Sequence, residues 1–177
     1  MKKISEFDIH AYNIIRESVS SFLKEQADKL DSPNVMLLDI APQDHLGAAE
    51  HFLKAKIETA DLNKDANATY TIDITNNNSE IIPNDSFDIV VCTEVLEHTL
   101  NPFSAISEIY RILKKDGILL LTTPFNFRIH GPLPDCWRFT EHGINALLKE
   151  FTSISITSVE DDMRFLMPYH YTTIAIK

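Results

Sequence analysis

The chain has 177 residues, a length that fits one domain and allows a sizeable buried core. Its formal net charge of -10 argues against unspecific binding to nucleic acid or anionic membranes, because both need a basic surface. No segment approaches the ~20 apolar residues of a membrane span, and acidic residues interrupt the start of the chain before a signal peptide could form. With two cysteines and no sign of a disulfide framework, we expect a cytoplasmic protein.

The predicted elements alternate between helices and buried strands along the chain. Residues 4–30 predict an amphipathic helix or a pair of helices, which Asp31, Ser32 and Pro33 end. Apolar runs predict strands at 35–40, 57–62 and 68–74, with a helix at about 46–53 between the first two. A helix over 141–151 precedes two last strands, 154–159 and 171–176, which follow each other directly.

Residues 87–124 hold a complete strand, helix and strand in succession. Residues 87–91 and 118–121 are short apolar runs, typical of parallel strands buried on both faces. Between them, Asn101 is a helix cap, Pro102 suits the first helical position, and apolar residues repeat at helical spacing. Gly117 is expected to take the left-handed conformation that ends this helix.

Seven strand candidates of this kind predict an α/β fold, a sandwich around a mostly parallel sheet with one antiparallel edge strand. We expect a single domain over 1–177, with a helical segment 1–33 ahead of a core 34–177. Open α/β sheets bind ligands at the carboxyl ends of their strands. The site is therefore expected among the polar residues that follow the strands, namely Asp39, Asp61, Asp73, residues 92–98 and residues 125–138.

The spaced motif in residues 87–124 resembles class I S-adenosylmethionine-dependent methyltransferases. The residues that carry the likeness are Phe87, Asp88, Val90, Val95, Leu96, Glu97 and His98, then Glu108, Ile109, Arg111, Leu113, Lys114, Gly117, Leu119, Leu120, Leu121 and Pro124. The resemblance covers roughly residues 35–177. It implies a Rossmann-like three-layer sandwich, S-adenosylmethionine as the cofactor, S-adenosylhomocysteine as its product, and methyl transfer as the activity.

The resemblance implies that the first strand and its loop flank the amino-acid end of the cofactor. Asp39, Ala41, Pro42 and Gln43 match this part of the family's site. Family members commonly read D-x-G-x-G-x-G here, whereas this chain has Ala41, Gln43 and His45 in place of the glycines. Glycine lets the backbone approach a ligand and adopt a positive φ, so this departure bears on cofactor binding.

The later strand ends match the rest of the family's cofactor site. Asp61, beside Leu62, matches the acid that bonds both ribose hydroxyls, for which a carboxylate is a suitable bidentate acceptor. Asp73 matches the residue that meets the adenine amino group, while Ile74 packs on the ring. The residues that run beside the methionine and methyl group are expected to be Cys92, Thr93 and Glu94.

Methyl transfer is an in-line displacement, so the protein mainly aligns donor and acceptor and excludes water. A hydroxyl acceptor also needs a general base. His130 and Asp135, in the long loop after the fifth strand, are the candidates for catalytic base. The alternative is that Asp135 pairs with Arg138 and that His130 only orders the loop.

The segment around Glu97 also carries polar groups toward the expected cleft. Glu94 and His98 are four residues apart, so a helical turn places them on one face. Glu94 is then a candidate for meeting the acceptor and His98 for stacking or hydrogen bonding near the cleft. For Glu97 we favour a structural role in holding the following loop.

A metal site is not expected from the sequence. The candidate ligands are scattered and lack the tight pairing of a zinc motif, namely Asp44, His45, His51, His98, His130, Asp135 and His142. The 130–140 loop has two aromatic residues, Trp137 and Phe139, which either form a wall of the acceptor site or pack on the core.

The 130–140 loop also resembles one found in a methyltransferase subgroup associated with sugar-modifying gene sets. We therefore expect a small-molecule acceptor that is polar, such as a sugar or a sugar-linked metabolite, methylated on oxygen or nitrogen. No large insertion follows the fifth strand, so a bulky acceptor would have to lie on the surface or be covered by a partner subunit, as in a homodimer. The rival hypothesis, motivated by the missing glycines, is a non-catalytic cofactor-binding or scaffolding protein of the same fold.

Overall fold

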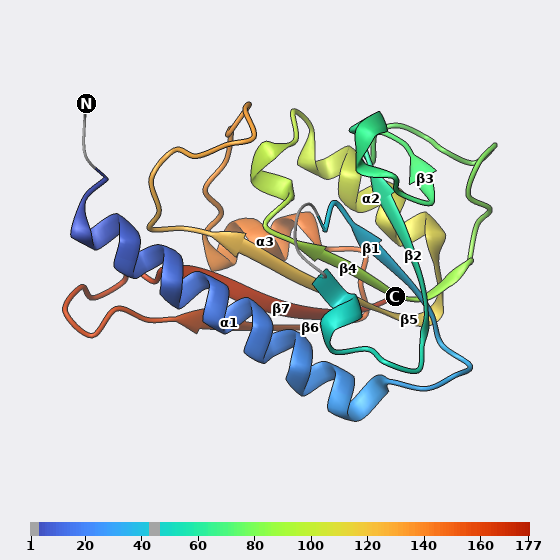
Figure 1. The fold of residues 1–177 in the computed structure, drawn as a ribbon, viewed down its shortest axis with the longest axis horizontal. Helices are drawn as coiled ribbons and strands as arrows, with labels where there is room; N and C mark the ends of the chain where they lie inside the picture. The colour runs from blue at the N-terminus through green and yellow to red at the C-terminus, as the bar shows by residue number, and fades with distance from the viewer. Residues whose placement is uncertain (1–3, 43–46) are drawn as a thin grey trace.

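The computed structural model describes residues 4–42 and 47–177 and shows one seven-stranded sheet between two layers of helix (Figure 1). The strand order is β3-β2-β1-β4-β5-β7-β6. The strands are β1 (Met36–Ile40), β2 (Lys56–Asp61), β3 (Tyr70–Thr71), β4 (Phe87–Thr93), β5 (Leu113–Pro124), β6 (Ser153–Val159) and β7 (His170–Ile176). The predicted α/β sandwich with a mostly parallel seven-stranded sheet is confirmed.

The antiparallel strand lies one position inside the edge rather than at the edge. β7 pairs antiparallel with both β5 and β6, so β6 forms the edge of the sheet. The chain crosses from β5 through a helix and forms β6 parallel to β5, one strand position away. β7 then returns without a helix and fills that gap, and a direct return of this kind makes it antiparallel to its neighbours.

Helix α1 (Glu6–Leu30) covers one face of the sheet, while α2 (Pro102–Ile112) and α3 (Glu141–Leu147) cover the other (Figure 1). The two cores are separate: α1 packs on Leu37, Ile89 and Leu120, whose neighbours along the strands point to the opposite face. This alternation is expected for strands buried on both faces. Within the predicted range 4–30, the structure has one long helix, Glu6–Leu30, rather than two.

Helix α2 begins as predicted and ends earlier than predicted. The Asn101 side chain accepts a hydrogen bond from the Ser104 amide at 3.1 Å, and Pro102 is the first helical residue. The helix stops at Ile112, and Asp116, with φ 62°, takes the left-handed conformation expected of Gly117. Gly117 lies in β5 instead, where a Cβ would stand 2.8 Å from a backbone carbonyl oxygen. The glycine is needed for a close approach and not for the helix end.

Three other predicted elements are shorter in the structure. The helix predicted at 46–53 contains only a 3-10 turn, η1 (Gly47–Glu50), because Asp31 accepts hydrogen bonds from the amides of residues 53–55 and draws the chain into a turn. The strand predicted at 68–74 pairs only over Tyr70–Thr71. The helix predicted at 141–151 ends at Leu147.

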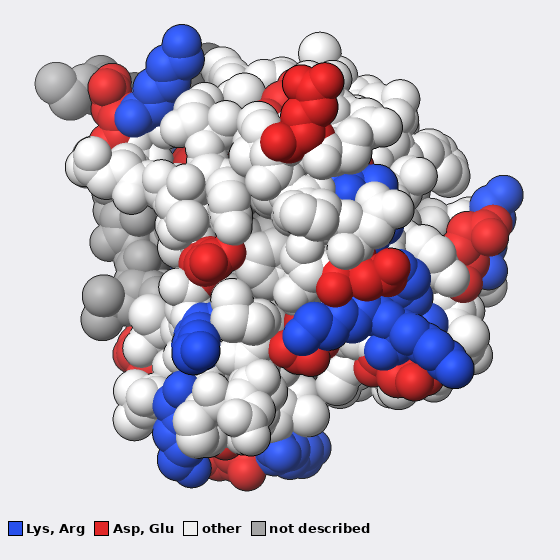
Figure 2. Space-filling view, turned by 90° about the vertical axis from the view of Figure 1, so that its right-hand side faces the viewer, with Lys and Arg blue, Asp and Glu red and all other residues white. Residues whose placement is uncertain are grey.

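The surface charge and the helices relate to two expectations from the sequence, that the protein binds neither nucleic acid nor membranes. Figure 2 shows one face of the molecule on which basic and acidic groups stand next to each other rather than forming an unbroken basic area. Within the described residues, none of the helices has the length and apolar character needed to cross a membrane.

Candidate functional site

The carboxyl ends of the central strands border a hollow on the α1 side of the sheet. The loop after β1 contributes Ala41 and Pro42, and the end of β4 contributes Thr93 and Glu94. Helix α1 forms a further wall, where the Ser20 hydroxyl lies 3.1 Å from Nε2 of His51. The N-terminal helix therefore both covers the core and borders this hollow.

Asp39 organises the turn that faces the hollow. Its carboxylate is buried, and Oδ2 accepts a hydrogen bond from the Ala48 amide at 2.7 Å. Burial raises the pKa of Asp39 to about 7, although the bond from Ala48 works in the opposite direction. Asp39 thus holds the turn at the start of η1.

Gly47 compensates in part for the glycines missing from the first loop. It has φ 54°, and a Cβ at this position would stand 2.3 Å from Oδ2 of Asp39 and 2.9 Å from Cβ of Pro42. Ala41 also has a positive φ, 51°, and its amide bonds the Ala60 carbonyl at 2.7 Å. The backbone near β1 therefore adopts left-handed conformations without the family's glycine pattern.

Gly47 is not among the residues predicted for the site, although it is the one glycine in the segment between the first two predicted strands. Gln43, one of the predicted cofactor residues, lies outside the described residues, as do Asp44 and His45.

The predicted ribose and adenine residues lie at the ends of neighbouring chain segments. Asp61 ends β2, and its Oδ1 accepts a hydrogen bond from the Asn63 amide at 2.7 Å, while Leu62 beside it is exposed. Asp73 uses Oδ1 for the amide and hydroxyl of Thr75. Ile74 is buried in the core.

The end of β4 divides its three predicted residues between core and hollow. Cys92 is fully buried among core side chains, and burial raises the pKa of its thiol. Thr93 and Glu94 border the hollow. Glu94 has φ 54° and accepts a hydrogen bond from the Thr122 hydroxyl at 2.9 Å. Cys92 is therefore a core residue, whereas Thr93 and Glu94 face the hollow.

The loop after β5 holds His130 and Asp135 together, yet gives them different roles. The buried Asp135 carboxylate is paired with the Arg138 guanidinium through both oxygens, and this pairing lowers the pKa of Asp135 to about 2. A carboxylate this acidic is a poor proton acceptor at neutral pH. Asp135 also lies 3.0 Å from Nδ1 of His130 and accepts from its amide, so it orients the histidine.

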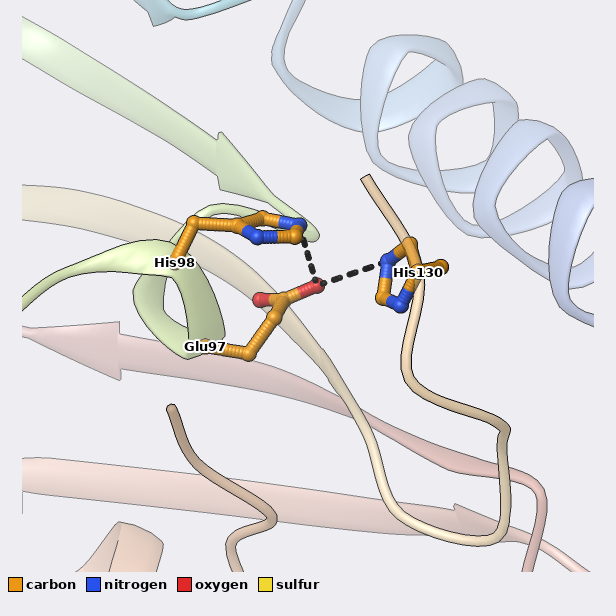
Figure 3. A group of neighbouring side chains, drawn as sticks. All are labelled: Glu97, His98 and His130. Atoms are coloured by element: carbon orange, nitrogen blue, oxygen red, sulfur yellow. Dashed lines mark ion pairs between the residues drawn. The ribbon is translucent and has the colours of Figure 1, made fainter. Parts of the chain in front are cut away.

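His130 is brought beside two residues of the turn η3 (Leu96–His98), as Figure 3 shows. Nε2 of His130 lies 3.8 Å and Nε2 of His98 lies 3.7 Å from the same carboxylate oxygen, Oε1 of Glu97. Burial lowers the pKa of His130, which favours the neutral imidazole. The sequence did not predict this grouping, because His130 is 32 positions from His98 and only the fold joins them.

The backbone of Glu97 contacts the loop after β5: its carbonyl accepts a hydrogen bond from the Cys136 amide at 2.7 Å. The Glu97 side chain makes no comparable hydrogen bond among the described residues. Both carboxylate oxygens are buried and make no hydrogen bond within the part of the chain that the structure describes.

The aromatic pair of the loop packs inward rather than forming an open wall. Phe139 is buried in the core, and Trp137 stacks on it with ring centroids 6.1 Å apart. The indole Nε1 of Trp137 donates to the Thr99 carbonyl at 2.8 Å. Trp137 is still 40% exposed, so one side of its ring faces solvent.

Comparison with known proteins identifies the family. A model described as a methyltransferase domain matches residues 12–163, which is most of the chain. The chain belongs to the methyltransferase domain family. The cofactor of this family is S-adenosylmethionine, in agreement with the resemblance of the motif in residues 87–124.

Solved structures share the fold of this methyltransferase domain. A SAM-dependent methyltransferase from Archaeoglobus fulgidus superposes with a TM-score of 0.69 at 16% identity, covering 98% of this chain and all of the other. The CurJ carbon methyltransferase gives a TM-score of 0.70 at 16% identity, covering 92% of this chain and 55% of the other.

Curated relatives match over a short segment only. The ubiquinone biosynthesis O-methyltransferase of Glaesserella parasuis is 46% identical over 43 residues, which are 24% of this chain and 18% of that protein. The alignment to the Haemophilus ducreyi enzyme of the same name spans 39 residues, 16% of its length. The matched segment thus spans less than a fifth of these relatives. One of these proteins acts on oxygen and another on carbon, so the family by itself does not fix the acceptor atom.

Proposed function

We propose that this protein transfers the methyl group of S-adenosylmethionine to an oxygen or nitrogen of a small polar acceptor, such as a sugar or a sugar-linked metabolite. The observation that carries the proposal is the hollow at the carboxyl ends of β1 and β4, at the place where open α/β sheets bind ligands. Family membership supplies the cofactor that this place would receive.

The cofactor would lie across the strand ends. Asp61 is the residue proposed to bind the ribose hydroxyls, and among the described residues only its Oδ1 is engaged, by the amide of Asn63. Asp73 and Ile74 are proposed at the adenine end. The backbone of Ala41 and Pro42, with Gln43, is proposed at the amino-acid end, in a turn that Asp39 holds.

The acceptor would lie on the side of Glu94 and His130. The turn η3 begins two residues after Glu94, so it stands at the same edge of the sheet. His130 presents Nε2 on this side because its Nδ1 is occupied by Asp135 and by the Arg128 carbonyl. A neutral Nε2 can accept the proton of an acceptor hydroxyl, and we propose His130 as the base with Asp135 as its positioning partner.

Formation of S-adenosylhomocysteine in the presence of hydroxylated and amino acceptors tests the proposal. Wild-type protein is expected to release S-adenosylhomocysteine with at least one sugar-type acceptor. His130→Gln should then lower kcat while the affinity for S-adenosylmethionine stays within about twofold, because the residue lies on the acceptor side. Equal losses of both quantities would assign His130 to structure. Cofactor binding without turnover on any acceptor would favour the scaffolding alternative.

A further inference from the structure

Three potential metal ligands meet at one point beside the sheet edge. Glu97 and His98 come from the turn η3, His130 comes from the loop after β5, and their ligand atoms lie within 4.8 Å of one another (Figure 3). We propose that Glu97, His98 and His130 bind a divalent transition-metal ion with the preferences of zinc. The site departs from the expectation, made from the sequence, that this chain has no metal site.

The distances fit ligands that face an ion rather than each other. Oε1 of Glu97 stands 3.7 Å from Nε2 of His98 and 3.8 Å from Nε2 of His130, which is too long for a hydrogen bond. Ligand atoms held about 2.0–2.1 Å from one tetrahedral ion stand roughly 3.3 Å apart. Formation of the site therefore requires each nitrogen-to-oxygen distance to close by about half an ångström and the two histidine rings, whose centroids lie 4.8 Å apart, to turn their Nε2 atoms toward the same ion.

Both histidines already present the nitrogen that a metal needs. Nδ1 of His98 lies 2.9 Å from the Pro134 carbonyl oxygen, and Nδ1 of His130 lies 3.0 Å from Oδ2 of Asp135. Each of these partners accepts only, so the tautomer that they favour has the proton on Nδ1 and the lone pair on Nε2. A carbonyl or carboxylate behind the ring is the usual support of a metal-binding histidine.

Glu97 supplies an independent indication that a cation belongs here. Its side chain is completely buried, and both carboxylate oxygens are without a hydrogen bond among residues 4–42 and 47–177. An uncompensated buried carboxylate is costly, and the Arg138 guanidinium nearby is already committed to both oxygens of Asp135. The carboxylates of Glu94 and Asp135 add negative charge around it. A divalent cation would relieve this arrangement.

The donor set selects the class of ion. Two imidazole nitrogens and one carboxylate oxygen suit zinc and neighbouring transition metals better than magnesium or calcium, which prefer oxygen ligands. Three protein ligands leave a fourth position for water or an acceptor oxygen. The use of that position in methyl transfer rests on the proposed function. Nε2 of His130 has one lone pair, so it acts as the proposed base in the metal-free protein and as a ligand in the metal-bound protein.

Zinc titration of chelator-treated protein tests the site and requires neither S-adenosylmethionine nor an acceptor. Calorimetry should show one zinc ion bound per chain, and Glu97→Gln, His98→Gln and His130→Gln should each weaken it by at least about 100-fold. Two controls should stay within twofold: His142→Gln, which removes an exposed histidine elsewhere, and Cys136→Ser, which removes the exposed thiol of the same loop.

Circular dichroism checks that each variant is folded, and the spectrum of wild-type protein with Co²⁺ gives a second readout that needs no variant. The expected spectrum is that of a low-coordinate site without thiolate charge transfer. Absence of stoichiometric zinc binding in the wild type, full affinity in all three ligand variants, or loss of binding in Cys136→Ser would overturn the proposal. If zinc binds as expected while S-adenosylmethionine does not, the metal site stands and the proposed function fails.

Discussion

Gly47→Ala is predicted to destabilise the protein and to damage the cofactor side of the site. The new Cβ would stand 2.3 Å from Oδ2 of Asp39 and 2.9 Å from Cβ of Pro42, both inside contact distance. The residue also keeps φ 54°, a conformation that costs an L-residue about 1–2 kcal/mol. Relief of the clash displaces the carboxylate from the Ala48 amide, a hydrogen bond worth about 1–2 kcal/mol. The sum is about 2–4 kcal/mol.

Urea unfolding at neutral pH measures this loss, and thermal unfolding should show Tm lower by about 5–15 °C for a chain of this size. Gly143→Ala is the matched control: its Cβ would meet nothing closer than 3.7 Å, and it lies in helix α3, so it should be neutral or stabilising by up to about 1 kcal/mol. If Gly47→Ala were as stable as Gly143→Ala, the close packing of Gly47 on Asp39 would be refuted as a determinant of this turn.

Three further predictions concern stability. Burial raises the pKa of Asp39 to about 7, so the free energy of unfolding of the ligand-free protein should fall by about 4 kcal/mol as pH rises from about 4 to above 7. Asp39→Asn should not show this fall, so its stability in urea should rise relative to wild type over that range. Parallel curves of stability against pH would contradict this. Burial alone would raise the pKa of Glu108, but hydrogen bonds from Arg111 and the Asn78 amide outweigh it and lower that pKa. Glu108→Gln should therefore lower the unfolding free energy most at neutral pH and should approach wild type as acid protonates Glu108. A constant difference down to pH 2 would count against the pairing. Ile109→Ala should lower the unfolding free energy, measured in urea, by about 2–5 kcal/mol, because this side chain of α2 is fully buried in the core.

The strands and the main helices were predictable because local signals and burial agree there. Asn101 and Pro102 mark the start of α2 whatever surrounds them, and the apolar run of β4 indicates a strand buried on both faces. The ends of elements were less predictable because distant groups decide them. Asp31 accepts hydrogen bonds from the amides of Leu53 and Ala55 and so holds a turn at the end of the predicted helix 46–53. Gly117 allows a close approach inside β5.

In the candidate site, too, the residues at strand ends were predictable and the contacts made by distant groups were not. Asp61, Thr93 and Glu94 lie at strand ends, as the topology requires once the strands are known. The side chain of Cys92 points into the core, because side chains alternate along β4. The grouping of His130 with Glu97 depends on how a long irregular loop returns to the sheet, and no local pattern in the sequence encodes that return.

Titration of the protein with S-adenosylmethionine and S-adenosylhomocysteine tests the central claim most directly. The account predicts saturable binding of both ligands, a loss of at least about tenfold in Asp61→Ala, where a charged hydrogen-bond acceptor is removed, and no change in Asp65→Ala, an exposed acid four residues away. The absence of heat at millimolar concentrations of either ligand, or equal binding by Asp61→Ala and Asp65→Ala, would contradict it.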